Sequence, residues 1–297
     1  MCIVVRKEED FMTVKRVLTL AILLLAVFTL SGCALIDDIS TYNDSDTPTL
    51  EDKMMDTRTL MRRANVGVNV EYRSGGSWIP GTGSRGESQG SGVVFAKTDS
   101  HYYALTNFHV IDPRDFDEVN VTIVPSMEEV EIDAAVIASD SERDLALLRF
   151  ALGDLDLGVL DINMDRYESL ERKDMLLAVG NPSAVNSIVT FGQYHGMVNT
   201  DDVDFEVIYH SALIYPGNSG GALVDLDGYL MGINTWGVSG EPERNLAVPL
   251  PEIIAFLEEE GVETDPGEPD GETGETMRHS HYIHFSFSAA SNWYLKG

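Results

Sequence analysis

The feature that most constrains this chain is a series of short segments in which apolar and polar residues alternate with a period of two. Such alternation is typical of a β-strand with one buried face. The clearest segment is 66–72, in which every second residue is apolar: Val66, Val68, Val70 and Tyr72. Further strand candidates follow at short, fairly even intervals between turn residues, namely 92–95, 102–106, 119–124, 130–137 and 145–150. This spacing favours a barrel or sandwich over βαβ units.

A second set of strand candidates begins after a linker near 153–172. Its members are 175–179, 187–191, 196–198, 205–209, 221–224, 229–233 and 246–248. We therefore predict two β-units of comparable size, at about 63–155 and 165–250, within one domain over 63–261. A short helix is expected to close this domain, because Pro251 suits a first helical turn and Gly261 suits a helix end.

Residues 1–32 have the pattern of a secretion signal. Lys15 and Arg16 precede an apolar run of 14 residues, Val17 to Leu30, whereas a membrane-spanning helix needs about 20. The run ends in Leu-Ser-Gly-Cys, which resembles the lipobox of bacterial lipoproteins. In that family the cysteine receives acyl chains such as palmitate and becomes the new N-terminus, so Cys33 is the expected membrane anchor. An ordinary secretory signal with a chance cysteine is the alternative.

Polar and acidic segments flank the predicted domain. Residues 33–62 are expected to form a tether, within which a short helix near 51–63 is the less favoured alternative. Residues 262–297 begin as an acidic stretch rich in glycine and proline, which is typical of disorder. Three histidines close to the end leave two interpretations, a metal site and an unstructured tail, and the second is favoured: His279, His281 and His284.

Composition narrows the partners and the chemistry. The chain has 49 acidic and 20 basic residues and a formal charge of −29, which repels phosphates, so no nucleic-acid partner is expected. Cys2 and Cys33 are the only cysteines, and the first would be lost with the signal, so no disulfide is expected. We predict neither a metal nor a cofactor.

Candidate catalytic residues occur at three places. The segment 216–221, Pro-Gly-Asn-Ser-Gly-Gly, sets Ser219 among glycines, and a nucleophilic serine needs a tight turn whose main-chain N–H groups surround its hydroxyl. A glycine-rich turn between two strands would explain this segment equally well. However, His109 follows one strand candidate and Asp144 precedes another. The three together predict a general base, its orienting carboxylate and a nucleophile.

These segments resemble the HtrA/Deg family of trypsin-like serine proteases. The similar phrases fall within about 64–258, and they are 90–94, 105–111, 144–148, 178–182, 216–223, 232–235 and 245–249. The resemblance implies an all-β fold of two six-stranded antiparallel β-barrels with a short C-terminal helix, and a triad of His109, Asp144 and Ser219 in the crevice between the barrels. It also implies an oxyanion hole made by the N–H groups of Gly217 and Ser219, with Asn218 shaping the turn.

The resemblance extends to a substrate pocket. Leu213, six residues before the serine, would lie at its base, Ile233 and Thr235 would line one wall, and Trp236 would narrow the entrance. Because no carboxylate stands at the base, we expect a small or medium aliphatic residue, such as Val or Ala, before the scissile bond.

The resulting hypothesis is a serine endopeptidase that cleaves unfolded or exposed proteins of the bacterial cell envelope, held outside the cytoplasm by its lipid anchor. The alternative is a catalytically silent protein that binds peptides on the same fold. Most HtrA proteins carry PDZ domains after the protease, but the 36 residues of 262–297 show no strand pattern. We therefore expect no PDZ domain, and the trimer that the resemblance implies stays open.

Overall fold

A computed structural model describes residues 48–75, 84–113, 116–128, 130–182, 187–237, 241, 244–266 and 283–286. The predicted signal peptide, Cys33, His279 and His281 lie outside these residues. The contacts of the chain separate residues 1–50 from residues 51–297, and the account below concerns the second unit. Within the described part of the chain, no helix is both long enough and apolar enough to span a bilayer.

The first barrel closes on itself with six antiparallel strands in the order β1-β2-β3-β6-β5-β4. The strands are β1 (Asn65–Arg73), β2 (Arg85–Lys97), β3 (His101–Thr106), β4 (Glu118–Pro125), β5 (Ile132–Asp140) and β6 (Leu145–Ala151). The period-two residues of β1 are all buried inside this barrel, together with Tyr102 and Phe150, whose rings stack at 5.6 Å. The alternation read from the sequence therefore marks the inner face of the barrel.

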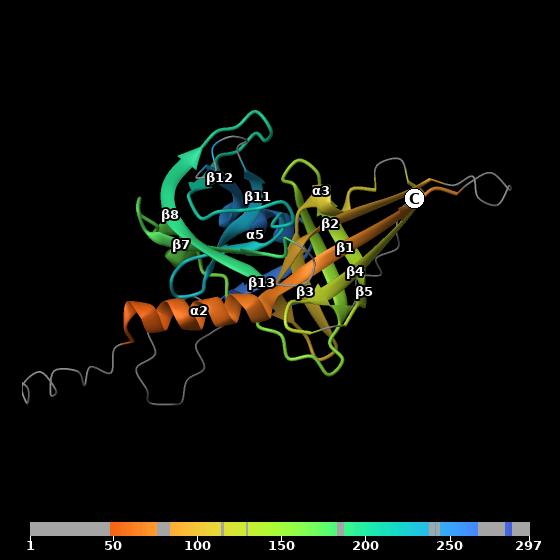
Figure 1. Cartoon of the computed structure of the whole chain (residues 1–297), viewed down its shortest axis with the longest axis horizontal. Helices are drawn as coiled ribbons and strands as arrows, with labels where there is room; N and C mark the ends of the chain where they lie inside the picture. Colours follow the sequence, from red (N-terminus) through yellow and green to blue (C-terminus); the bar gives the residue numbers. More distant parts are fainter. Residues whose placement is uncertain are drawn as a thin grey trace, which may run out of the picture. The chain divides into compact units, whose positions relative to one another are not determined.

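The second barrel is closed in the order β10-β11-β12-β9-β8-β7. Its strands are β7 (Met175–Gly180), β8 (Ile188–Val198), β9 (Val207–His210), β10 (Ala222–Val224), β11 (Leu230–Gly237) and β12 (Asn245–Pro249). The prediction of two six-stranded antiparallel barrels is confirmed. Figure 1 shows them side by side, with the strands of each barrel gathered at one side of the molecule.

Two strands differ from the sequence prediction. β2 extends back to Arg85, through polar residues that precede the strand candidate 92–95, because its main chain pairs with β1 along the register Arg73↔Arg85 to Asn65↔Val93. The segments 187–191 and 196–198 are one strand, β8, with a register shift between Tyr194 and Gly196. A bulge of this kind bends a strand without ending it.

Helix α5 (Leu250–Glu259) follows the second barrel as predicted, with Pro251 in its first turn and Ile253, Phe256 and Leu257 buried. Two shorter helices lie between strands, α3 (Phe108–Ile111) and α4 (Met164–Glu168). The buried side of α5 belongs to a hydrophobic cluster that also contains Leu105 of the first barrel and Leu177 of the second. The two barrels are therefore joined by a continuous core.

Helix α2 (Leu50–Ala64) occupies residues that composition assigned to the tether. Its residues Met61 and Ala64 are fully buried in the same cluster as α5, and Thr57 Oγ1 donates to Leu226 O at 2.7 Å. Burying a methionine side chain contributes about 1.5–3 kcal/mol, which explains why this charged segment is helical and packed. Figure 1 shows the helix running alongside the second barrel to the start of β1.

The predicted tail also contains regular structure. Strands β13 (Glu263–Pro266) and β14 (Ile283–Ser286) pair as an antiparallel ribbon. The acidic composition gave no signal for this ribbon. The other residues of the predicted tail lie outside the described part of the chain, except Val262, which is buried against α5.

Candidate active site

His109 and Asp144 form a close pair at one end of the first barrel. His109 lies on α3, directly after β3, and Asp144 ends the turn before β6. One carboxylate oxygen of Asp144 accepts the main-chain N–H of His109 at 2.8 Å, and the other lies 2.8 Å from its ring Nδ1. A carboxylate at Nδ1 holds the ring proton there, which leaves Nε2 as a proton acceptor. The Asp144 side chain is 11% exposed and that of His109 46%, so the base faces solvent while its partner is shielded.

The turn that carries Asp144 is held on both sides. Asp144 has a φ of +55°, a region that aspartate tolerates better than most residues, and its carbonyl accepts the Asn107 side-chain amide at 2.8 Å. The preceding Arg143 binds three carboxylates, those of Asp140, Glu252 and Glu259. Since two of these belong to α5, the C-terminal helix helps to position the turn.

Ser219 lies in a tight loop of the second barrel that only glycines can complete. Gly217 and Gly220 have φ values of +98° and +87°. A Cβ on Gly220 would lie 2.1 Å from Ser91 O, so a side chain there would collide with the first barrel. The glycines around the serine therefore allow both the turn and the close approach of β2, as the sequence suggested.

The main-chain N–H groups of this loop are divided into two kinds. Those of Asn218, Gly220 and Gly221 donate to Tyr215 O, Asn234 O and Asn218 O, at 2.9, 2.9 and 3.0 Å respectively. Those of Gly217 and Ser219 donate to no acceptor among the residues that the structure describes. The two N–H groups that the oxyanion prediction named are thus the ones with free hydrogen-bonding capacity within the described chain.

The segments that carry Ser219 and His109 come from different barrels and both lie close to Gly90 of β2. A Cβ on Gly90 would lie 2.7 Å from Val110, the neighbour of His109, and 3.0 Å from Ser219 O. The Ser219 hydroxyl donates to Thr235 O at 3.4 Å. Among the described residues no hydrogen bond joins this hydroxyl to the His109 ring. The long distance marks a weak hydrogen bond, which costs little to exchange for one to the imidazole.

A buried amide ties the two halves of the site together. Asn107 is fully buried, and its Nδ2 donates both to Asp144 O and, at 2.9 Å, to Thr235 Oγ1. The Thr235 carbonyl in turn accepts the hydroxyl of Ser219. Asn107 belongs to a phrase on which the family resemblance rests, yet its role depends on a contact between residues that are 128 positions apart, for which the local sequence has no signal.

The residues predicted to line the substrate pocket have different environments. Ile233 is fully buried in the core cluster, and Thr235 Oγ1 is occupied by Asn107 and by Ile233 O. The side chains of both thus point into the protein, and only their main chain remains for a substrate. Leu213 is half-buried, and its carbonyl accepts Thr190 Oγ1 at 2.7 Å. The sequence did not single out Ile214, which lies within 4 Å of where a Gly237 Cβ would be.

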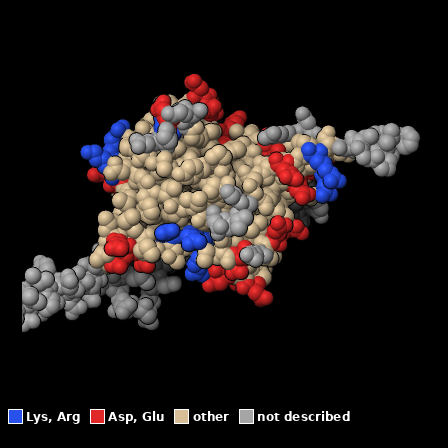
Figure 2. Space-filling view, in the orientation of Figure 1, with Lys and Arg blue, Asp and Glu red and all other residues tan. Residues whose placement is uncertain are grey.

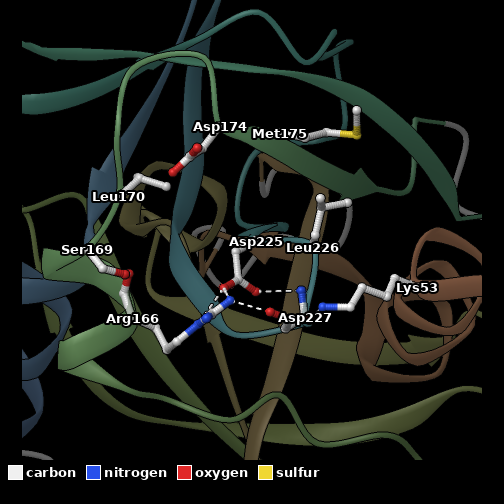
Figure 3. A pocket seen from close by; sticks show the side chains of 9 residues that line it. All are labelled: Lys53, Arg166, Ser169, Leu170, Asp174, Met175, Asp225, Leu226 and Asp227. Atoms are coloured by element: carbon white, nitrogen blue, oxygen red, sulfur yellow. Dashed lines mark hydrogen bonds and ion pairs between the residues drawn. The ribbon is translucent and has the colours of Figure 1, made fainter. Parts of the chain in front are cut away.

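A separate polar cavity of about 250 Å³ lies between α2, α4 and the turn after β10. Figure 3 shows Arg166 reaching Asp225 and Asp227, with Lys53 of α2 beside the same carboxylates. Arg166 binds Asp225 at 2.7 Å and also pairs with Asp227, which Lys53 contacts as well. Each cation is thus matched by a carboxylate. The cluster holds α2 on the second barrel and leaves no free charge for an anionic ligand.

The acid excess is unevenly distributed on the surface. On the face drawn in Figure 2, charged side chains gather toward the edges, with acidic groups prominent there, and a broad central area carries few charges. The formal charge of −29 therefore does not mean that every part of the surface is acidic.

Comparison with known proteins agrees with this geometry. A family model described as "Trypsin-like peptidase domain" matches residues 90–233. Together with the two closed barrels, this match assigns the fold to the trypsin-like class.

Similar proteins narrow the class. "Serine protease Do-like HtrA" of Bacillus subtilis (strain 168) is 27% identical over 236 residues, which cover 73% of this chain and 50% of that protein. "Probable periplasmic serine endoprotease DegP-like" of Pseudomonas fulva (strain 12-X) is 34% identical over 163 residues, 52% of this chain and 31% of that protein. A solved structure titled "HtrA-type protease AlgWS227A with decapeptide" has a TM-score of 0.58 at 26% identity, covering 73% of this chain and 72% of that one.

The chain is thus similar to the trypsin-like peptidase domain over residues 90–233 and, more broadly, to HtrA/Deg-like serine proteases. It spans between about a third and a half of the length of these two curated relatives.

Proposed function

We propose that this protein is a serine endopeptidase with His109 as general base, Asp144 as its orienting partner and Ser219 as nucleophile. The observation that carries the proposal is the pair of bonds from Asp144 to the ring and the main chain of His109. A carboxylate at Nδ1 leaves Nε2 as the proton acceptor that the proposed general base needs. A surface histidine with a structural role would not need a buried carboxylate to select its tautomer.

The proposed reaction follows from these positions. The Ser219 hydroxyl turns from Thr235 O to the His109 Nε2, which takes its proton as Ser219 Oγ attacks the peptide carbonyl. The N–H groups of Gly217 and Ser219 stabilise the negative oxygen of the tetrahedral intermediate. His109 then gives its proton to the leaving amine, and a water molecule, activated in the same way, releases the acyl group.

The substrate proposal is a polypeptide with a small or medium aliphatic residue before the scissile bond. Its support is the absence of a carboxylate at Leu213 and the presence of Ile214 beside Gly237. Unfolded or exposed envelope proteins are the proposed substrates, and lipid anchoring through Cys33 outside the cytoplasm is proposed as well. The names of the periplasmic relatives support the location, and the trimer remains a proposal from family resemblance.

Labelling with a fluorophosphonate tests the activity. The wild type should be labelled and should cleave an unfolded protein such as denatured casein, whereas Ser219→Ala should do neither. Ser211→Ala is the matched control, because it removes a half-buried hydroxyl from the segment between β9 and the same loop and should remain labelled. A folded wild type that binds peptides without being labelled would instead favour the silent peptide-binding protein. Frequent cleavage after Arg or Lys in a peptide library would refute the proposed specificity.

A further inference from the structure

Ser91 of β2 is a buried serine of the first barrel whose polar groups face the nucleophile loop of the second. It is 0% exposed. Its N–H donates to Ser219 O at 2.8 Å, and its hydroxyl donates to Gly217 O at 2.6 Å. One residue of the first barrel therefore binds the carbonyls on both sides of Asn218, which precedes the nucleophile.

Three successive peptide units of the loop are fixed in this way. In the unit 217–218 the carbonyl is held by the Ser91 hydroxyl and the N–H by Tyr215 O. In the unit 219–220 the carbonyl is held by the Ser91 N–H and the N–H by Asn234 O. In the unit between them the carbonyl accepts the Gly221 N–H. Because a trans peptide places N–H opposite C=O, the Ser219 N–H is thereby aimed in one direction.

The direction of the Ser91 hydroxyl proton is also determined. The Asn181 N–H donates to Ser91 Oγ at 2.7 Å, which occupies a lone pair and leaves the single hydroxyl proton for Gly217 O. The hydrogen bond from the Ser91 hydroxyl restrains Gly217, which has a φ of +98°. As a glycine, this residue could otherwise adopt many backbone conformations. Without the hydroxyl, the 217–218 peptide would keep only its bond to Tyr215 and could rotate.

We propose that Ser91 is a positioning residue for the oxyanion hole: its hydroxyl, oriented by Asn181, fixes the 217–218 peptide plane, which lies between the peptide units that carry the free N–H groups of Gly217 and Ser219. This inference rests on the proposed endopeptidase function and adds a residue to it. Ser91 acts through the loop and does not contact the substrate. Its contribution should therefore appear in the transition state rather than in substrate binding.

The test compares Ser91→Ala with wild type on a chromogenic peptide that has Val before the scissile bond. Outright loss of an oxyanion donor lowers kcat by about 10²–10³-fold, so loss of its orientation should lower kcat by about 10-fold with KM unchanged. A peptide boronate, whose tetrahedral adduct places an oxygen in the oxyanion hole, should bind more weakly by the same factor. Ser91→Thr retains the hydroxyl and should recover most of kcat.

Ser187→Ala is the matched control, because Ser187 is a buried serine whose hydroxyl bonds the side chains of Asn65 and Asn181 and not the loop. It should keep the wild-type kcat. An active wild type with unchanged kcat in Ser91→Ala would overturn the inference. Equal losses of kcat and unfolding free energy in Ser91→Ala and Ser187→Ala would also overturn it, by showing a general packing effect. A wild type that is neither labelled nor active would refute the proposed function itself, and the inference with it.

Discussion

The two barrels contribute to the candidate site in different ways. In the first barrel, His109 and Asp144 are paired through both oxygens of one carboxylate, in contacts that arise within that barrel alone. In the second, the Ser219 loop is held by bonds within its own barrel and also by two bonds from Ser91 of the first barrel, and the Ser219 hydroxyl donates to Thr235 O. The direct contacts of the His109–Asp144 pair thus lie within one barrel, whereas the Ser219 loop also depends on contacts across the junction between barrels. Variants that act on one side only can test this difference.

The largest effect is expected from Asp144→Asn, which acts on the first barrel. Asparagine tolerates the positive φ of this position, so the fold should persist while the wrong tautomer of His109 is favoured. We expect kcat to fall by about 10⁴-fold, measured with the chromogenic peptide. The control is Asp140→Asn, a carboxylate of the same turn that binds Arg143 and not His109. Equal activity losses in both variants would show that the turn, rather than the His109–Asp144 pair, is what matters.

Met61→Ala acts on the shared core and should leave both halves of the site intact. Met61 is fully buried, and truncation of such a side chain lowers the free energy of unfolding by about 2–5 kcal/mol. Denaturant unfolding measures this loss, and kcat of the folded fraction should be unchanged. Exposed Met55 of the same helix supplies the control, Met55→Ala, which should alter stability little. A stability loss of similar size in both variants would contradict the packed position of α2.

His210 makes the second barrel sensitive to acid. Burial, with a smaller effect of the nearby His195, lowers the pKa of His210 to about 3, well below the value of about 6.5 in the unfolded chain. Between these values the unfolded state binds the extra proton, so stability is complete above about pH 6.5 and is lost as pH falls.

The variant His210→Phe removes this titration. By the difference in pKa, its stability loss between pH 7 and pH 4 should be smaller than that of wild type by up to about 3 kcal/mol, as measured by urea unfolding at each pH. His101→Phe is the comparison, because His101 is half-buried at the start of β3 and its ring bonds only Ser100 among described residues. If His210→Phe kept the wild-type pH dependence, another group would be responsible.

Asn107→Ala breaks the tie between the two halves. The buried Asn107 amide donates to Asp144 O and to Thr235 Oγ1. Its removal takes away a hydrogen bond from each of these oxygens, which lowers the free energy of unfolding by about 1–3 kcal/mol. We also expect kcat to fall by about 10-fold, because misplacing the two halves of the site by enough to raise the activation free energy by about 1.4 kcal/mol slows the reaction tenfold. Steady-state kinetics together with thermal unfolding would separate the two effects. Unchanged kcat would mean that the barrels hold their halves of the site independently.

The smallest effect is expected from Lys53→Gln, which removes a partly exposed ion pair between α2 and Asp227. Such pairs contribute about 0–1 kcal/mol, and Arg166 still faces Asp227 in the variant. The free energy of unfolding should change by less than about 1 kcal/mol, and less still at high salt. A larger loss would show that the cavity in Figure 3 contributes more to the docking of α2 than its geometry indicates.

The sequence by itself predicted the two barrels, which the structure confirms, and it singled out the residues to which we assign catalytic roles as a proposal. Period-two burial in β1, the glycines around Ser219, and the strand-end positions of His109 and Asp144 are local properties, and a local pattern is enough to identify them. The same pattern could not show that residues 50–64 form a packed helix, because the burial of Met61 is created by elements from elsewhere in the chain.

Only the tertiary structure decided how the parts of the site are held. Ser91 and Gly217 are 126 positions apart, as Asn107 and Thr235 are 128, and a hydrogen bond across such a distance leaves no periodic trace in the sequence. The structure also showed that the side chains of Ile233 and Thr235 are occupied inside the protein. Directions of side chains depend on which strands become neighbours, and that is settled only when both barrels close against each other.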